Sequence, residues 1–168
     1  MQTITDIKEI QNVQAELLPR LIDQWALLTA GPADDSNTMT IAWGSLGDLW
    51  WKPVIDAYVA PSRYTFGLMQ KYDNFTVSFL PDEYHDDLMT LGTLSGRDGD
   101  KIAQTRLTRK VVDGGVTFEE ADTVLVCKKI YVQPLDPAVV PDWAMQKYYA
   151  DMAPHVLFLG EIVSALKA

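Results

Sequence analysis

Cysteine and histidine are scarce in this sequence of 168 residues, which holds one cysteine, Cys127, and two histidines. One thiol cannot close an intrachain disulfide, so a disulfide-stabilised fold is excluded. A structural zinc site takes several nitrogen or sulfur ligands, and the chain has too few of them to build one. We therefore expect a reduced, cytoplasmic protein that holds no metal ion.

Long apolar segments are absent as well. No run approaches the roughly 20 apolar residues that a membrane helix needs, and Met1–Glu9 carries three charged residues where a signal peptide has an apolar core. The sequence shows no repeat, low-complexity tract or linker. Its length suffices for one buried core, so we expect a single soluble domain over residues 1–168, without membrane attachment.

Positive charge is the third scarce property. The chain has 14 Lys and Arg residues against 23 Asp and Glu residues, which gives a net charge of -9. Such an acidic surface repels nucleic acids and anionic membranes, so we expect neither as a partner. Any anion that this protein binds must be held by a local cluster of cations.

Short strand-like segments outnumber helical ones. Apolar or alternating runs bounded by Gly, Pro and Asp predict strands over residues 25–30, 39–45, 54–60, 75–79, 123–132 and 155–165, and a hairpin around Asp113–Gly115. Short helices are expected between strands, from Ser62 as N-cap to Tyr72, after Asp86–Asp87, and over residues 142–150. This order predicts a mostly β protein with short helices, folded as a closed antiparallel barrel and not as a parallel sheet.

One candidate anion site is Pro61–Thr65, which leaves a predicted strand and opens a predicted helix. The first turn of a helix offers free backbone N–H groups and a positive dipole end, both of which attract phosphate. Ser62 and Thr65 add hydroxyl groups, and Arg63 adds a guanidinium that can bind two phosphate oxygens. The alternative is a capped surface helix that binds nothing.

A second candidate is the stretch Thr93–Lys101, where two glycines let backbone N–H groups turn inward. Ser95, Arg97 and Lys101 supply a hydroxyl and two cations, while two aspartates in the same stretch must point away from a bound phosphate. Taken alone, this segment also fits a solvated loop. With Arg63, however, it concentrates the positive charge that a monophosphate site requires.

The segment Asn37–Ser45 mixes small, hydroxyl, thioether and indole side chains. A flat heteroaromatic ligand needs such an apolar face with polar groups along one edge. Met39, Ile41 and Trp43 also fit the alternating core positions of a strand. His155, at the start of the last predicted strand, is the one weak catalytic candidate, because the unperturbed pKa of a histidine side chain lies near neutrality. A half-exposed structural role fits it equally.

Three motifs, taken in order, resemble the flavin reductase-like family of FMN-binding split barrels, and within it the flavoredoxin-type subgroup. They are Asn37-x-Met39-Thr40-x-x-Trp43-Gly44, Pro61-Ser62-Arg63-Tyr64-Thr65 and Ser95-Gly96-Arg97-Asp98-x-Asp100-Lys101. The similarity runs from about Trp25 to Ile162. It implies a six-stranded antiparallel FMN-binding split barrel that pairs as a homodimer.

The resemblance also implies which residues bind FMN. The two motifs that carry cations would bind the phosphate. The first motif would lie along the isoalloxazine ring. The complete cofactor-binding set is Asn37, Met39, Thr40, Trp43, Ser62, Arg63, Tyr64, Thr65, Ser95, Gly96, Arg97 and Lys101. One departure is Trp51, which stands where the family has a small residue and would narrow the cofactor mouth.

We interpret the chain as an NAD(P)H-dependent flavin reductase that supplies reduced flavin or electrons to a partner, such as a monooxygenase or an electron-transfer protein. NADH or NADPH would be the co-substrate. Two alternatives stay open: a flavoredoxin-type electron carrier that NAD(P)H does not reduce, and a barrel that has lost the flavin and serves as a binding module. Trp50 and Trp51 either wall the exposed ring face or lie in a dimer contact.

Overall fold

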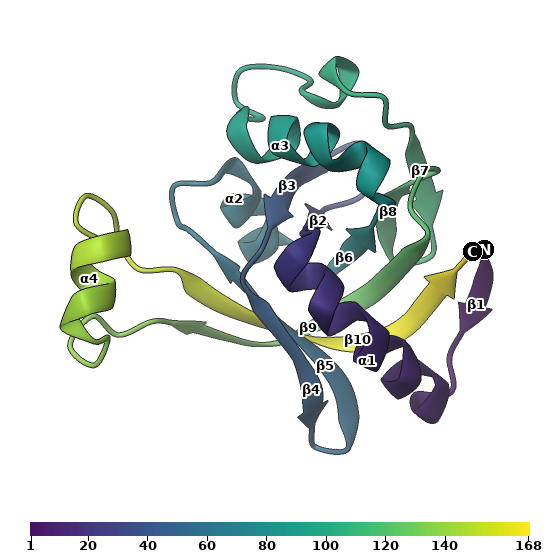
Figure 1. Ribbon diagram of the computed structural model, residues 1–168, viewed down its shortest axis with the longest axis horizontal. Coiled ribbons are helices and arrows are strands. Elements are labelled where there is room, and N and C mark those ends of the chain that lie inside the picture. Colours follow the sequence, from purple (N-terminus) through teal and green to yellow (C-terminus); the bar gives the residue numbers. More distant parts are fainter.

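An antiparallel β-sheet forms the centre of the computed structural model, which describes all 168 residues (Figure 1). Eight strands pair in the order β3-β2-β6-β9-β10-β5-β4, with β1 beside β10, and β7 and β8 form a separate hairpin. The strands are β1 (Gln2–Ile4), β2 (Ala26–Ala30), β3 (Asn37–Ile41), β4 (Gly44–Leu49), β5 (Lys52–Val59), β6 (Asn74–Phe79), β7 (Arg109–Val112), β8 (Gly115–Phe118), β9 (Thr123–Pro134) and β10 (Val156–Lys167).

The sheet curls around one core without closing. Side chains from six strands meet in a single buried cluster: Leu28, Met39, Ile55, Phe75, Leu125 and Phe158. The hydrogen-bonded path nevertheless ends at β3 and β4, which do not pair with each other. The mostly β, antiparallel split-barrel class is therefore confirmed. The expected number of six strands is wrong, because the sheet has eight strands and a hairpin lies beside it.

The predicted strand over residues 39–45 is divided into β3 and β4. β3 pairs with β2, whereas β4 pairs with β5, so the chain crosses between the two edges of the split at Ala42 and Trp43. Gly44 permits this crossing: a Cβ atom there would lie 2.6 Å from the carbonyl oxygen of Asp56. The crossing places Trp43 at the mouth of the split.

The longest helix, α1 (Ile7–Asp23), was not predicted, and its 17 residues exceed the short helices expected between strands. Its signals are present in the sequence. The carboxylate of Asp6 caps the helix by accepting from the N–H groups of Lys8 and Glu9 at 3.0 and 3.1 Å. Its buried residues, Ile10, Val13, Gln14, Leu17 and Leu21, follow helical spacing.

Two helices pack against β3, namely α2 (Tyr64–Lys71) and α3 (His85–Thr93), the latter preceded by the 3₁₀ turn η1 (Asp82–Tyr84). The prediction of Ser62 as N-cap is wrong. The N–H group of Arg63 donates to the carbonyl of Ala60 at 3.0 Å, and this extra turn delays the helix so that Arg63 takes the cap position. Arg63 therefore lies at the entrance of α2.

β6 shows the predicted alternation, but both of its faces are buried. Phe75, Val77 and Phe79 enter the barrel core. The opposite face is covered by the β7–β8 hairpin, where the hydroxyl groups of Ser78 and Thr117 lie 2.8 Å apart. The hairpin predicted around Asp113–Gly115 is confirmed, with Asp113 and Gly114 in the turn.

The segment 135–155, which joins β9 to β10 and carries α4 (Asp142–Tyr148), projects from the barrel as an arm (Figure 1). The helix ends two residues before the predicted boundary at residue 150. The ring of Tyr148 lies 5.1 Å from that of Trp43, so the arm packs against the strand crossing. None of the helices combines the length and hydrophobicity that crossing a membrane requires.

Candidate functional site

A pocket of about 210 Å³ lies where the start of α2 meets the loop after α3. We call it the anion pocket because it gathers the three predicted cations. Its lining consists of Asn37, Met39, Ser62, Arg63, Tyr64, Thr65, Thr93, Leu94, Ser95, Gly96, Arg97 and Lys101. The two predicted anion-binding segments, far apart in the sequence, therefore form one site.

Lys101 is the most buried of the three cations, with 4% of its surface exposed. Its ammonium group donates to the carbonyls of Leu91 and Leu94 at 2.6 and 3.1 Å, at the C-terminal end of α3. Burial, followed by the charge of Arg63, lowers the pKa of Lys101 from 10.5 to about 8. No carboxylate lies within ion-pair distance of it, so this buried charge lacks a counter-ion.

The two arginines are positioned by backbone carbonyls. A guanidinium nitrogen of Arg63 donates to Gly92 at 2.6 Å, and one of Arg97 donates to Ser62 at 3.0 Å. Neither forms an ion pair, although eight other cations of the chain do. Asp100 turns away from the pocket and binds Arg109 at 2.7 Å. The pocket therefore keeps its positive charge free for a ligand.

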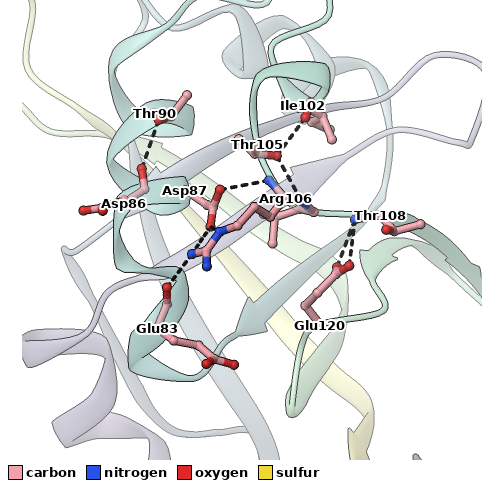
Figure 2. A network of polar contacts seen from close by, with 10 residues as sticks. Glu83, Asp86, Asp87, Thr90, Ile102, Thr105, Arg106, Thr108 and Glu120 are labelled. Atoms are coloured by element: carbon pink, nitrogen blue, oxygen red, sulfur yellow. Dashed lines mark hydrogen bonds and ion pairs between the residues drawn. The ribbon is translucent and has the colours of Figure 1, made fainter.

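The loop after α3 is held against its neighbours by the polar network in Figure 2. Arg106 binds the buried carboxylate of Asp87 on α3 through its backbone N–H and its Nε, both at 2.9 Å. The hydroxyl of Thr105 donates to the carbonyl of Ile102 at 2.7 Å, in the 3₁₀ turn η2 (Ile102–Gln104) that follows Lys101. This network fixes the backbone that presents Lys101.

Asn37 and Gly96 close the anion pocket tightly. The amide nitrogen of Asn37 donates to the hydroxyl of Thr65 at 2.7 Å, and both residues are buried. A Cβ atom at position 96 would lie 2.2 Å from the amide oxygen of Asn37 and 2.7 Å from the ring of Tyr64. Only glycine fits there, so the Ser95–Arg97 loop approaches β3 and α2 closely.

A second pocket, of about 380 Å³, continues from the first. We call it the ring slot. It shares Met39, Ser62 and Arg63 with the anion pocket, so the two form one groove. Its lining consists of Met39, Thr40, Ile41, Ala42, Trp43, Tyr58, Ala60, Ser62, Arg63, Gly92, Met152 and His155.

Aromatic side chains close the far end of the ring slot. The ring of Trp43 lies 5.0 Å from that of His155, and His155 Nδ1 lies 3.1 Å from the hydroxyl of Tyr149. Burial, followed by the charge of Arg63, lowers the pKa of His155 below its ordinary value. The imidazole is therefore neutral at physiological pH and presents a flat, weakly polar surface.

All twelve residues predicted to bind the cofactor line this groove. That they hold FMN stays a prediction, because proximity alone does not identify the ligand. Sequence reasoning missed Tyr58, near the end of β5, and Ala60, directly after it, although their spacing of two residues in the run that leads to Pro61 would have indicated them. It also missed Met152, which reaches the slot from the arm and has no signal in the sequence.

Trp50 and Trp51 do not line the groove of their own chain. They form the turn between β4 and β5, with 67% and 89% of their surfaces exposed. Figure 1 shows this hairpin projecting away from α2 and α3. Within one chain, the interpretation that Trp51 narrows the cofactor mouth is therefore wrong.

A larger hollow of about 690 Å³ lies beside β1 and the β7–β8 hairpin. Lys110 and Lys128 line it, but Lys110 is paired with Glu119 and Lys128 is exposed. It therefore lacks the buried, unpaired charge of the groove. The groove combines a cationic pocket with an adjoining flat slot, an arrangement suited to a phosphorylated aromatic ligand.

Comparison with known structures supports the fold. The FMN-binding protein of Thermus thermophilus with bound 1-cyclohex-2-enone aligns with a TM-score of 0.68 and 23% identity over 85% of this chain and 69% of that one. The flavoredoxin of Methanosarcina acetivorans gives 0.67 and 20% over 86% and 68%. The NADH:FAD oxidoreductase of Streptomyces globisporus gives 0.67 and 15% over 97% and 85%.

Comparison with the curated proteins found no match. The family model described as the flavin reductase like domain, in contrast, matches residues 18–167. This match spans nearly the whole chain and includes every residue of the groove. The chain belongs to the flavin reductase-like family.

Proposed function

We propose that this protein binds FMN along the groove and acts as an NAD(P)H-dependent flavin reductase. The observation that carries the proposal is the buried, unpaired Lys101, set with Arg63 and Arg97 at one end of a groove whose other end is a flat slot. A buried charge without a partner is costly, so the site is built for an anion. A phosphate attached to a flat ring system fits both ends.

The chain's own residues hold and shield this ligand. Arg63, Arg97 and Lys101 would bind the phosphate, with the free N–H groups at the start of α2. Met39, Trp43 and His155 would wall the ring and keep water from one of its faces. When bound, FMN supplies the redox chemistry, accepting a hydride from a nicotinamide and passing electrons on.

The electron donor is tested by mixing the FMN-loaded protein with NADH or NADPH without oxygen and following the visible flavin absorption. A reductase loses this absorption with one or both nicotinamides. Dithionite, which reduces flavin without a nicotinamide, is the matched control. Absorption that persists with both nicotinamides but disappears with dithionite would contradict the proposed donor.

An FMN electron carrier is the second candidate, and it predicts that persistent absorption. Its support is that flavoredoxins from two organisms align at 20% identity and a TM-score of 0.67, and the oxidoreductase has the same TM-score at 15% identity. In that case a partner protein delivers the electrons. Titration with a reduced electron-transfer protein would then reduce the bound flavin.

We also propose a homodimer. Trp50, Trp51 and Trp143 are 67%, 89% and 65% exposed, and aromatic residues of this size are enriched in subunit contacts. They lie at the tip of the β4–β5 hairpin and on the arm, the two parts that project from the barrel (Figure 1). Light scattering at micromolar concentration tests this proposal, and a monomer mass with flavin bound would contradict it.

A further inference from the structure

The hydrogen bonds of Lys101 suit a neutral amine as well as a cation. Its side chain lines the anion pocket and donates to the carbonyls of Leu91 and Leu94 at 2.6 and 3.1 Å. An ammonium group has three N–H donors, whereas these two carbonyls are the acceptors that the chain offers it. A neutral amine uses both of its N–H groups on them and keeps its lone pair for a third direction. In that form Lys101 is a nucleophile.

The electrostatics around Lys101 favour the neutral form. The residue is 4% exposed, and no carboxylate forms an ion pair with it. The neighbouring Asp100 binds Arg109 instead. Burial, followed by the charge of Arg63, lowers the pKa of Lys101 to about 8. At pH 8 about half of this amine is therefore neutral, against about 0.4% for an ordinary exposed lysine.

We propose that Lys101 is a site of covalent acylation by acyl phosphates, which dock through their phosphate on Arg63 and Arg97 when no flavin fills the groove. An acyl phosphate is a carboxylic acid joined to phosphate, so it carries an electrophilic carbonyl carbon directly beside the anion. Both arginines line the same pocket as Lys101, and neither forms an ion pair. A phosphate bound to them would bring the acyl carbon to the amine. This inference goes beyond the proposed function, because it concerns another reaction and needs no flavin.

The acylation is a transfer of the acyl group from phosphate to nitrogen. The amine of Lys101 attacks the acyl carbon and forms a C–N bond, while the C–O bond to phosphate breaks and the phosphate leaves with the electron pair. The proton of the amine passes to the leaving phosphate, whose charge the two arginines stabilise. The pocket of about 210 Å³ suits a small acyl group such as acetyl. The product is an uncharged amide, so the pocket loses one of its three cations.

Two other lysines are internal controls for this reaction. Lys129 is also mostly buried, with 14% of its side chain exposed, and it donates to the carbonyls of Met69 and Tyr72 at 2.6 and 2.9 Å. It lies 3.9 Å from the carboxylate of Asp73 and lines neither the anion pocket nor the ring slot. Lys129 therefore has the burial and the carbonyls without the arginines. Lys128 is exposed and forms no ion pair, so it represents an ordinary surface lysine.

Acetyl phosphate is the probe for the test. The full chain, freed of flavin, is incubated with it at pH 8, and peptide mass spectrometry measures the acetylation rate at each lysine. Lys101 is expected to react at least about tenfold faster than Lys128. Its neutral fraction is about a hundredfold larger, and the lower nucleophilicity of a weaker base offsets about tenfold of this, as for thiols. Lys129 is expected to react more slowly than Lys128. Inorganic phosphate, at about ten times its dissociation constant, is expected to slow Lys101 about tenfold and to leave Lys128 unchanged.

Arg97→Ala separates phosphate docking from the reactivity of the amine, because Arg63 also lowers the pKa of Lys101 and Arg97 does not. The variant is expected to slow acetylation of Lys101 by acetyl phosphate about tenfold. Acetic anhydride, which has no phosphate, is expected to acetylate Lys101 equally in both proteins. A rate at Lys101 no higher than at Lys128, no protection by phosphate, or equal losses with both reagents in Arg97→Ala would overturn the inference. None of these results involves flavin, so the proposed function would stand.

Discussion

Lys101→Met separates a ligand-binding role from a structural one, because it removes the buried charge and keeps a side chain of similar length. Lys101 is 4% exposed, and its ammonium group has no carboxylate partner. Its pKa is lowered from the ordinary 10.5 to about 8. Burying the charged form therefore lowers the free energy of unfolding by roughly 3 kcal/mol at neutral pH. The substitution removes that cost.

The same substitution also removes the hydrogen bonds to Leu91 and Leu94. Each is worth about 1–2 kcal/mol, since the donor is charged. The two effects nearly cancel. We therefore expect the free energy of unfolding of the flavin-free variant to lie within about 1 kcal/mol of the wild-type value. Urea denaturation followed by tryptophan fluorescence measures this difference.

FMN binding is expected to change far more than stability. Loss of one charge-assisted bond to phosphate costs about 1.5–3 kcal/mol, which is roughly ten- to a hundredfold in the dissociation constant. Riboflavin has no phosphate and is expected to bind equally to both proteins. Calorimetric titration of wild type and Lys101→Met with FMN and with riboflavin measures the ratio of the two proteins' dissociation constants for each ligand. Equal losses for FMN and riboflavin, or a stability loss above about 3 kcal/mol, would refute the reasoning.

Arg63→Ala is expected to weaken FMN about tenfold and to spare riboflavin, since its guanidinium faces the same pocket; calorimetry showing equal losses would assign Arg63 to the fold. Because the pKa of Lys101 is lowered to about 8, the unfolded flavin-free chain binds more protons above that pH. Wild type is therefore expected to gain stability relative to Lys101→Met as the pH rises from about 8 to 10, and parallel denaturation curves would contradict this. Trp51 has a φ of 59°, which a bulky residue adopts at a cost of about 1–2 kcal/mol. Trp51→Gly is expected to raise monomer stability by about 1 kcal/mol and to weaken the dimer seen by light scattering. A dimer of unchanged strength would place Trp51 outside the contact.

Local patterns predicted most of the strands because apolar alternation and turn residues act over short distances. They did not predict the division of the strand around Trp43. That break depends on the close approach of Gly44 to β5, a contact between segments distant in the sequence. The burial of both faces of β6 was likewise not visible, since a later hairpin supplies the second cover.

α1 could have been predicted. Its cap at Asp6 and the spacing of Ile10, Val13, Leu17 and Leu21 are both local signals. The cap of α2 is a different case, because the turn that places Arg63 there is set by the backbone after Ala60.

The groove was predicted in its polar half better than in its apolar half. Arg63, Arg97 and Lys101 stand out against an acidic composition. Their charge therefore indicated a common anion site before the structure was known. The contribution of Met152 depends on how the arm returns to the barrel, and no local pattern encodes it.

The central claim, that the groove holds FMN by its phosphate, is tested most directly by the flavin content of the protein. Purified protein is mixed with excess FMN, passed through a desalting column and examined by visible absorption, with riboflavin as the comparison. The account predicts that FMN is retained at about one per chain and that riboflavin is lost, because only the phosphate engages the three unpaired cations. Loss of both flavins, or equal retention of both, would contradict it.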